Sequence, residues 1–108
     1  MTWSDPFASF DAAALTSNTD GVVLNLDGVF TDHAVQYTVS TGTSTDVTFK
    51  VQGSLDGANW YDLGISLVLT SSTSLTTLQV VSLKPAQYLR VNAVVSGTVT
   101  VTALLTSR

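Results

Sequence analysis

The chain has 108 residues, a length that indicates a single domain able to bury a hydrophobic core without cross-links. It contains no cysteine, which excludes disulfide frameworks, thiol catalysis and cysteine-based metal centres. Four basic residues against eight acidic ones give a net charge of −4, and this inventory cannot supply the phosphate contacts of nucleic-acid binding. Charged residues make up only 11% of the chain, against about 25% in ordinary domains. A surface so poor in charge indicates a protein that is covered by a partner or packed into an assembly.

The N-terminal stretch MTWSDPFASF has neither the basic start nor the apolar run of a signal peptide. No apolar run approaches the ~20 residues that a transmembrane helix needs. We therefore expect synthesis in the cytoplasm and no membrane partner.

Residues 1–20 show neither strand alternation nor a long helical stripe, and we expect them to form an N-terminal arm or lead-in. Trp3, Phe7 and Phe10 lie in this segment among small and polar residues. Either the arm folds back on its own domain, or these aromatics dock on another subunit, where such anchors tend to dominate binding. The three are therefore candidate partner-binding residues.

From residue 21 to 108 the pattern predicts one β-sandwich domain, because apolar and polar residues alternate with period 2. The segment at 60–70 is either one strand bent at Gly64 or two short strands. Turn signals follow at Asp27-Gly28, Asp56-Gly57 and Ser96-Gly97. Strands are expected at 21–26, 33–40, 46–54, 60–70, 75–83, 87–95 and 98–105. Seven or eight short strands at this spacing predict an all-β fold, an antiparallel β-sandwich of jelly-roll-like type.

The stretch VQGSLDGANWYDLG, residues 51–64, raises the main functional question. Trp60 and Tyr61 are adjacent, so they point to opposite faces of a strand and cannot share one platform unless the strand bends. We expect Trp60 to close the core at a structural hairpin corner that it forms with Asp56 and Gly57. The alternative is that Trp60 belongs to an exposed sugar-binding platform.

Few residues of the sequence could serve in catalysis or in metal binding. His33 is the only histidine, and no nucleophile motif accompanies it. Asp20, Asp27 and Asp32 could supply oxygen ligands to Ca²⁺, but their spacing matches no calcium loop, and turn formation explains them. We therefore expect no enzyme activity, no catalytic residue, no metal site and no cofactor.

Two resemblances rest on short motifs. The hairpin GSLDGANW (53–60) and the late strand QYLRV (87–91) resemble elements of discoidin-like (F5/8 type C) sandwiches, which include sugar-binding modules. The same hairpin, together with LNLDG (24–28), VQYTV (35–39) and YLRV (88–91), resembles small virion proteins of tailed bacteriophages. The order of these strands and the short length favour the phage resemblance, which covers roughly residues 15–105.

The phage resemblance implies a non-enzymatic virion component, first of all a head decoration (cement) protein on the capsid surface. Its partners would be the major capsid protein or other virion proteins, with assembly in the host cytoplasm. Analogy with small sandwiches that expose apolar strips suggests a homo-oligomer, plausibly a trimer. The alternative is a carbohydrate-binding module, or a tail or head-fibre accessory protein that contacts host glycans.

Overall fold

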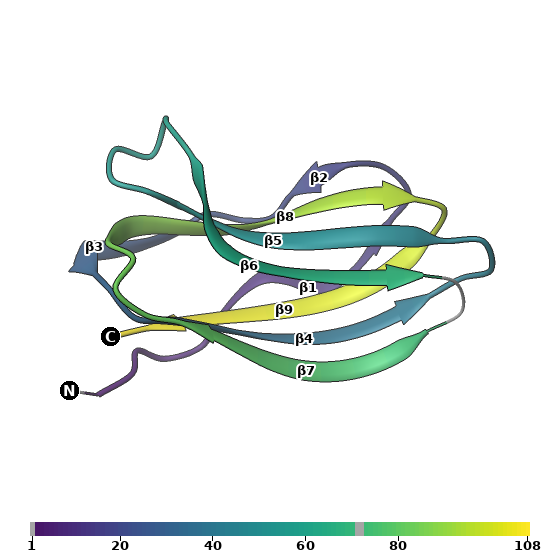
Figure 1. Cartoon of the computed structure of the whole chain (residues 1–108), viewed down its shortest axis with the longest axis horizontal. Helices are drawn as coiled ribbons and strands as arrows, with labels where there is room; N and C mark the ends of the chain where they lie inside the picture. Colours follow the sequence, from purple (N-terminus) through teal and green to yellow (C-terminus); the bar gives the residue numbers. More distant parts are fainter. Residues whose placement is uncertain (1, 71–72) are drawn as a thin grey trace.

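The computed structural model describes residues 2–70 and 73–108, and it consists of two antiparallel sheets packed face to face (Figure 1). This arrangement confirms the predicted all-β sandwich. In order across the first sheet, the strands are β1 (Phe7–Leu15), β9 (Val99–Ser107), β4 (His33–Thr41) and β7 (Ser74–Val81). The second sheet runs β2 (Thr19–Asp20), β8 (Ala86–Ser96), β5 (Asp46–Ser54) and β6 (Tyr61–Thr70), and β3 (Leu24–Phe30) also pairs with β8.

The strand order is that of a jelly roll. Because β2 and β3 pair with successive parts of β8, they act as one interrupted strand. The first half of the chain then pairs with the second half in reverse order: β1 with β9, β2 and β3 with β8, β4 with β7, and β5 with β6. A long antiparallel ribbon of this kind, rolled on itself, gives two sheets joined by Greek-key connections. The segment before β1 lies at the same end of the sandwich as the end of β9, where the Ser4 N–H donates to the Ser107 carbonyl (2.8 Å) (Figure 1).

The core lies between the sheets and is built from the inward residue of each alternating pair. Val47, Phe49 and Val51 of β5 are all buried, as their alternation predicts. Tyr37 of β4 stacks on Phe49 across the sandwich, with ring centroids 5.3 Å apart. The late strands β8 and β9 also bury alternate residues, which are Leu89, Val91, Ala93, Val95, Val99, Val101, Ala103 and Leu105.

The N-terminal segment departs from the prediction, because residues 7–15 form an edge strand of the sandwich and not an arm. The pairing of β1 with β9 shifts register between Ala8 and Phe10 and again between Phe10 and Ala13. These bulges switch the inward phase, so Ser9 and Phe10 are both buried although they are adjacent. The sequence therefore shows no clean period 2 here, and the sandwich has no boundary at residue 21.

Two further details differ from the predicted strands. Asp27-Gly28 lies inside β3, where Asp27 has a φ of 54° and the pairing with β8 shifts register, so the expected turn is a bulge. Val22, which alternates with the half-buried Leu24 and Leu26, is exposed. Of the two alternatives for the segment at 60–70, the structure has the single strand, β6, with Gly64 at a φ of 87°.

Candidate functional site

The three N-terminal aromatics lie in different environments. Phe10 is 5% exposed in the core, so the prediction that it anchors a partner is wrong: β1 turns it inward opposite Ala103. Phe7 is half-buried at the start of β1. Trp3 precedes the strand and stacks on Arg108, with the guanidinium carbon 4.6 Å from the ring centroid. Of the three, Trp3 and Phe7 keep side-chain surface that a partner could reach.

The hairpin corner between β5 and β6 is held by one carboxylate. Asp56 Oδ1 accepts the backbone N–H groups of Ala58 (2.9 Å) and Asn59 (2.8 Å), and the Ser54 hydroxyl donates to it (2.9 Å). These hydrogen bonds, the backbone ones first, hold the pKa of Asp56 well below its ordinary value. Gly57 adopts a φ of 77°. Asp56 and Gly57 thus shape the loop, as their turn chemistry predicts.

Trp60 does not close the core, which corrects the sequence prediction. Leu63 fills the interior beneath the hairpin, and it fits there because Gly53 has no side chain: a Cβ at Gly53 would lie 2.9 Å from Leu63 Cδ2. Trp60 remains half-exposed on the outer face of the second sheet. Its ring lies against Arg90, whose guanidinium carbon is 4.2 Å from the ring centroid. Neither Trp60 nor the exposed Tyr61, whose hydroxyl donates to the Pro85 carbonyl, packs inward.

A connected set of polar side chains covers the outer face of the second sheet beside Trp60. The strand register places Arg90, Gln52 and Asp62 side by side. Arg90 Nε donates to Gln52 Oε1 (2.9 Å), and Gln52 Nε2 donates to Asp62 Oδ1 (3.1 Å). Lys50 lies 3.5 Å from Asp62, while Asp20 lies 3.3 Å from Arg90 and accepts from Asn92 (2.8 Å). We call this set the polar platform; its members are Asp20, Lys50, Gln52, Asp62, Arg90 and Asn92.

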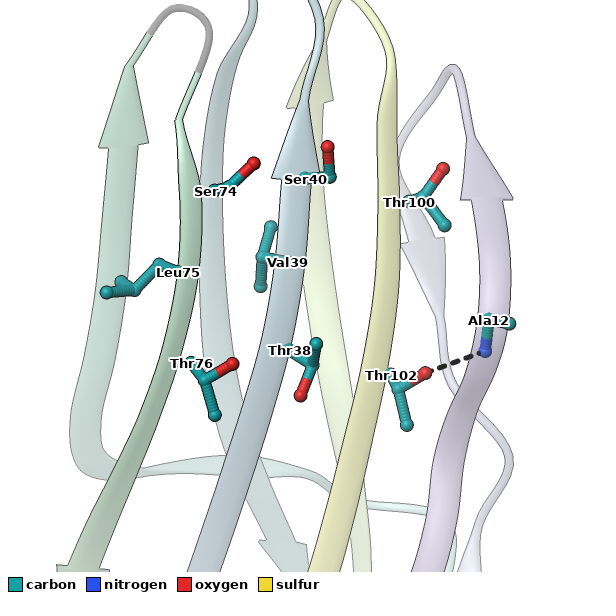
Figure 2. Close-up of a pocket in the computed structure, with 9 residues that line it drawn as sticks. All are labelled: Ala12, Thr38, Val39, Ser40, Ser74, Leu75, Thr76, Thr100 and Thr102. Atoms are coloured by element: carbon teal, nitrogen blue, oxygen red, sulfur yellow. Dashed lines mark hydrogen bonds between the residues drawn. The ribbon is translucent and has the colours of Figure 1, made fainter.

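On the outer face of the first sheet, the outward side chains of β4, β7 and β9 are all uncharged. The strand register forms rows such as Ser74–Ser40–Thr100 and Thr76–Thr38–Thr102. Figure 2 shows these hydroxyl side chains projecting from neighbouring strands, with Thr102 Oγ1 accepting the Ala12 N–H (2.9 Å). They line a shallow depression of about 430 Å³. We call the outward residues of β4, β7 and β9 the uncharged face; they are Gln36, Thr38, Ser40, Ser74, Thr76, Leu78, Val80, Thr100, Thr102, Leu104 and Thr106.

His33 makes a structural contact and not a reactive one. Its Nε2 donates to the Lys84 carbonyl (2.8 Å), so Nδ1 accepts from the Ser107 hydroxyl (2.6 Å). Both His33 (0% exposed) and Ser107 (1% exposed) are closed off from any substrate. Burial lowers the pKa of His33 from its ordinary value, against the raising effect of its bond to Lys84. The pair ties β4, β9 and the β7–β8 connection together.

Within residues 2–70 and 73–108, no three His or Asp side chains gather as a group that could hold a metal ion. The three candidate ligands are dispersed: Asp20 joins the polar platform, Asp32 pairs with Arg108 (3.3 Å), and Asp27 lies in the β3 bulge. The same part of the chain has no helix long and apolar enough to cross a membrane.

The chain matches no protein-family model and no curated protein sequence. Its structure is similar to that of the SPBc2 prophage-derived protein YomS, with a TM-score of 0.62 and 17% identity over 99% of this chain and 96% of YomS. It is also similar to VP2 of infectious bursal disease virus, solved as a subviral particle (TM-score 0.62, 10% identity). That match covers 97% of this chain but only 31% of VP2. A pectin-binding carbohydrate-binding module gives a TM-score of 0.55 and 18% identity, over 94% of this chain and 86% of the module. At these identities the likenesses establish the fold, a β-sandwich that occurs in viral and in carbohydrate-binding proteins.

The sequence predicts that some members of the polar platform face outward, but it does not predict that they contact one another. Alternation along β5 already turns Lys50 and Gln52 outward. The contact of these side chains with Asp62 and Arg90 depends on the register with β6 and β8, which strand alternation within β5 cannot supply. The stacking of Trp60 on Arg90 has no signal in the sequence near Trp60, because Arg90 belongs to β8, 30 residues further along the chain.

Proposed function

We propose that this chain is a non-enzymatic structural component of a tailed-phage virion. In its most specific form the proposal is a capsid decoration protein that binds the outside of the major capsid protein shell and stabilises it, after assembly in the host cytoplasm. The sequence resemblance to phage virion proteins and the fold shared with prophage-derived YomS along nearly the whole of both chains support this assignment. The observation that carries it is the uncharged face.

The uncharged face suits burial in an assembly for a physical reason. Desolvating a hydroxyl costs far less than desolvating a charge, and each Thr or Ser can regain its hydrogen bond with a partner. The rows are formed by short side chains on a sheet, so a partner can approach closely over a broad area. Many copies on one lattice also engage together, so modest affinity at each site is sufficient for stable decoration.

Self-association is part of the proposal. Leu78 (63% exposed) and Val80 (52% exposed) lie at the β7 edge of the uncharged face, near Leu104. Packing them against sister copies, as a trimer at a threefold position of the shell, would remove this apolar surface from water. Light scattering on the purified protein tests this step. A monomer at all concentrations would count against a preformed trimer.

The main test places a charge in the middle of the uncharged face. Thr38→Lys should leave the fold intact but abolish cosedimentation with expanded capsids, because the ammonium group would be buried without a partner. Thr48→Lys is the matched control: it adds the same charge to the central strand on the outer face of the second sheet. If Thr38→Lys binds capsids as the wild type does, the uncharged face is not the docking surface.

Glycan binding is the second candidate, as a carbohydrate-binding module or as an accessory protein of a tail or head fibre. One specific observation favours it. Trp60, the aromatic that the sequence assigns to the core, lies half-exposed beside polar side chains on a sheet face. The fold shared with a pectin-binding module is compatible with this candidate.

A further inference from the structure

We propose that the polar platform and Trp60 together form a binding site for a neutral polysaccharide, which recognises sugar hydroxyls along the face of the second sheet. This inference rests on the second candidate function, glycan binding, and specifies its site and ligand class. It is compatible with capsid attachment, because the platform and the uncharged face lie on opposite sides of the sandwich (Figure 1).

The platform has hydrogen-bonding capacity left over. An ammonium group carries three donors and a carboxylate about four acceptor positions. Lys50 Nζ makes one contact within the described chain, to Asp62, and Asp62 accepts only from Lys50 and Gln52. Both side chains are well exposed, at 41% and 49%. A donor and an acceptor held next to each other match the vicinal hydroxyls of a sugar, each of which can accept and donate.

The same side chains are held in place before any ligand arrives. Gln52 lies between Arg90 and Asp62 and bonds to both, and its strand, β5, is central in the sheet. The Arg90 guanidinium is fixed further by Trp60 and by Asp20. Groups that are already ordered lose little entropy on binding, which favours recognition of a ligand as weakly held as a sugar.

Trp60 supplies the apolar component at one end of the row. Tyr88 lies next to Arg90 on the outward side of β8 and borders the same hairpin: a Cβ at Gly57 would lie 3.5 Å from its ring. Aromatic rings with a polar surround suit ligands that present both C–H and O–H groups, as sugar rings do.

A shallow depression adjoins the row on its β6 side. It measures about 220 Å³ and is lined by Lys50, Asp62, Gly64, Ile65 and Ser66. The space above Gly64 in this depression is open, since a Cβ at this position would meet no atom within 4 Å. Pockets for drug-sized ligands span roughly 300–1,000 Å³, so this depression suits a single sugar unit of a longer chain.

The charges of the platform select the ligand class. Lys50 and Arg90 are balanced by Asp20 and Asp62, and each cation contacts an anion. The site therefore offers no net attraction to a polyanion, because both of its cations are already paired with carboxylates. A neutral polysaccharide is the ligand that this balance favours.

The test measures binding of soluble neutral polysaccharides, a β-glucan and a mannan, by affinity electrophoresis and calorimetry, with polygalacturonate as the acidic probe. Wild-type protein should bind at least one neutral polymer, and Trp60→Ala and Asp62→Ala should each weaken this binding by about tenfold or more. Trp3→Ala is the matched control, because Trp3 stacks on Arg108 as Trp60 stacks on Arg90, away from the platform. Thermal unfolding of each variant checks that the fold is intact.

Three outcomes would overturn the inference: no neutral polymer bound, undiminished binding by both Trp60→Ala and Asp62→Ala, or tighter binding of polygalacturonate than of the neutral polymers. The last two would still leave glycan binding in place, at another site or for another ligand. Capsid cosedimentation of Trp60→Ala should equal that of the wild type, so failure of this inference and failure of the decoration proposal give different results.

Discussion

At the scale of single residues, Tyr37 shows how strongly the core favours shape over polarity. Its ring is fully buried and stacks on Phe49, yet its hydroxyl has no hydrogen-bond partner among the described residues. Burial alone raises the pKa of Tyr37 above its ordinary value. An unpaired buried hydroxyl costs about 1–3 kcal/mol, so the ring must more than offset that loss.

Tyr37→Phe should therefore leave the free energy of unfolding unchanged or raise it by up to about 1 kcal/mol, because the ring remains and the unpaired hydroxyl is removed. Tyr61→Phe is the matched comparison and should lower stability slightly, since the Tyr61 hydroxyl donates to Pro85. Urea denaturation of both variants measures the difference. A clear fall in stability for Tyr37→Phe would mean that its hydroxyl has a partner in solution.

The residue scale also shows where prediction from the sequence fails. Trp60 is large and apolar, and size alone places it inside. The structure instead fills that space with Leu63, because Gly53 and Ala86 leave room for a branched aliphatic side chain. Gly53 and Leu63 lie within residues 51–64, but Ala86 comes from β8, so the packing of this corner depends on a strand pairing that the stretch itself does not show.

At the scale of elements, the gap between β2 and β3 is closed by a residue from the other sheet. Val91 of β8 lies where neither short strand pairs. Ser9 of β1 fills this gap: its hydroxyl accepts the Val91 N–H (3.0 Å) and donates to the Val22 carbonyl (3.0 Å). Gly21 completes it by donating to the Val91 carbonyl (2.8 Å), and a Cβ there would lie 2.2 Å from Ser9 Oγ. Ser9 thus joins the edges of the two sheets.

Ser9→Ala should lower the free energy of unfolding by about 1–3 kcal/mol, since it leaves the buried Val91 N–H without a partner. Ser82→Ala, on an exposed loop, should change stability little and serves as the control. Denaturant unfolding gives both values, and hydrogen exchange at the Val91 amide reports the local effect. If the two variants are equally stable, water replaces the Ser9 hydroxyl at no cost.

The strands that the sequence predicts well are those with an unbroken period. Alternation locates β4 to β9 to within about two residues, because a run in each strand turns every second side chain inward. The bulges in β1 and β3 break this period, and these are the elements that the pattern misses or misplaces. Bulges depend on the partner strand, and so the pattern of one strand does not contain them.

At the scale of the whole molecule, one buried histidine links distant parts of the fold. The acidic residues are all Asp, and His33 is the only histidine. Histidine is the side-chain type whose ordinary pKa places its charge change between about pH 5 and 8, and here it is a single buried group. That group holds together β4, the end of β9 and the connection before β8, so its protonation acts on the fold as a whole.

The sign of the resulting pH dependence follows from the lowered pKa of His33, whose ordinary value is 6.5. The folded protein holds the imidazole neutral, while the unfolded chain takes up a proton once the pH falls through 6.5. The stability that His33 contributes is thus fully present above pH 6.5 and is lost progressively as the pH falls toward the lower folded pKa. The free energy of unfolding should decline over this window by no more than about 1.4 kcal/mol per pH unit, the limit for one proton.

Urea unfolding from pH 5 to 7.5 measures the slope, and His33→Gln should flatten it. The imidazole resonance of the wild type, followed by NMR, should titrate with a midpoint below 6.5. A midpoint at or above 6.5, or a slope that persists without His33, would contradict a buried neutral histidine at this junction.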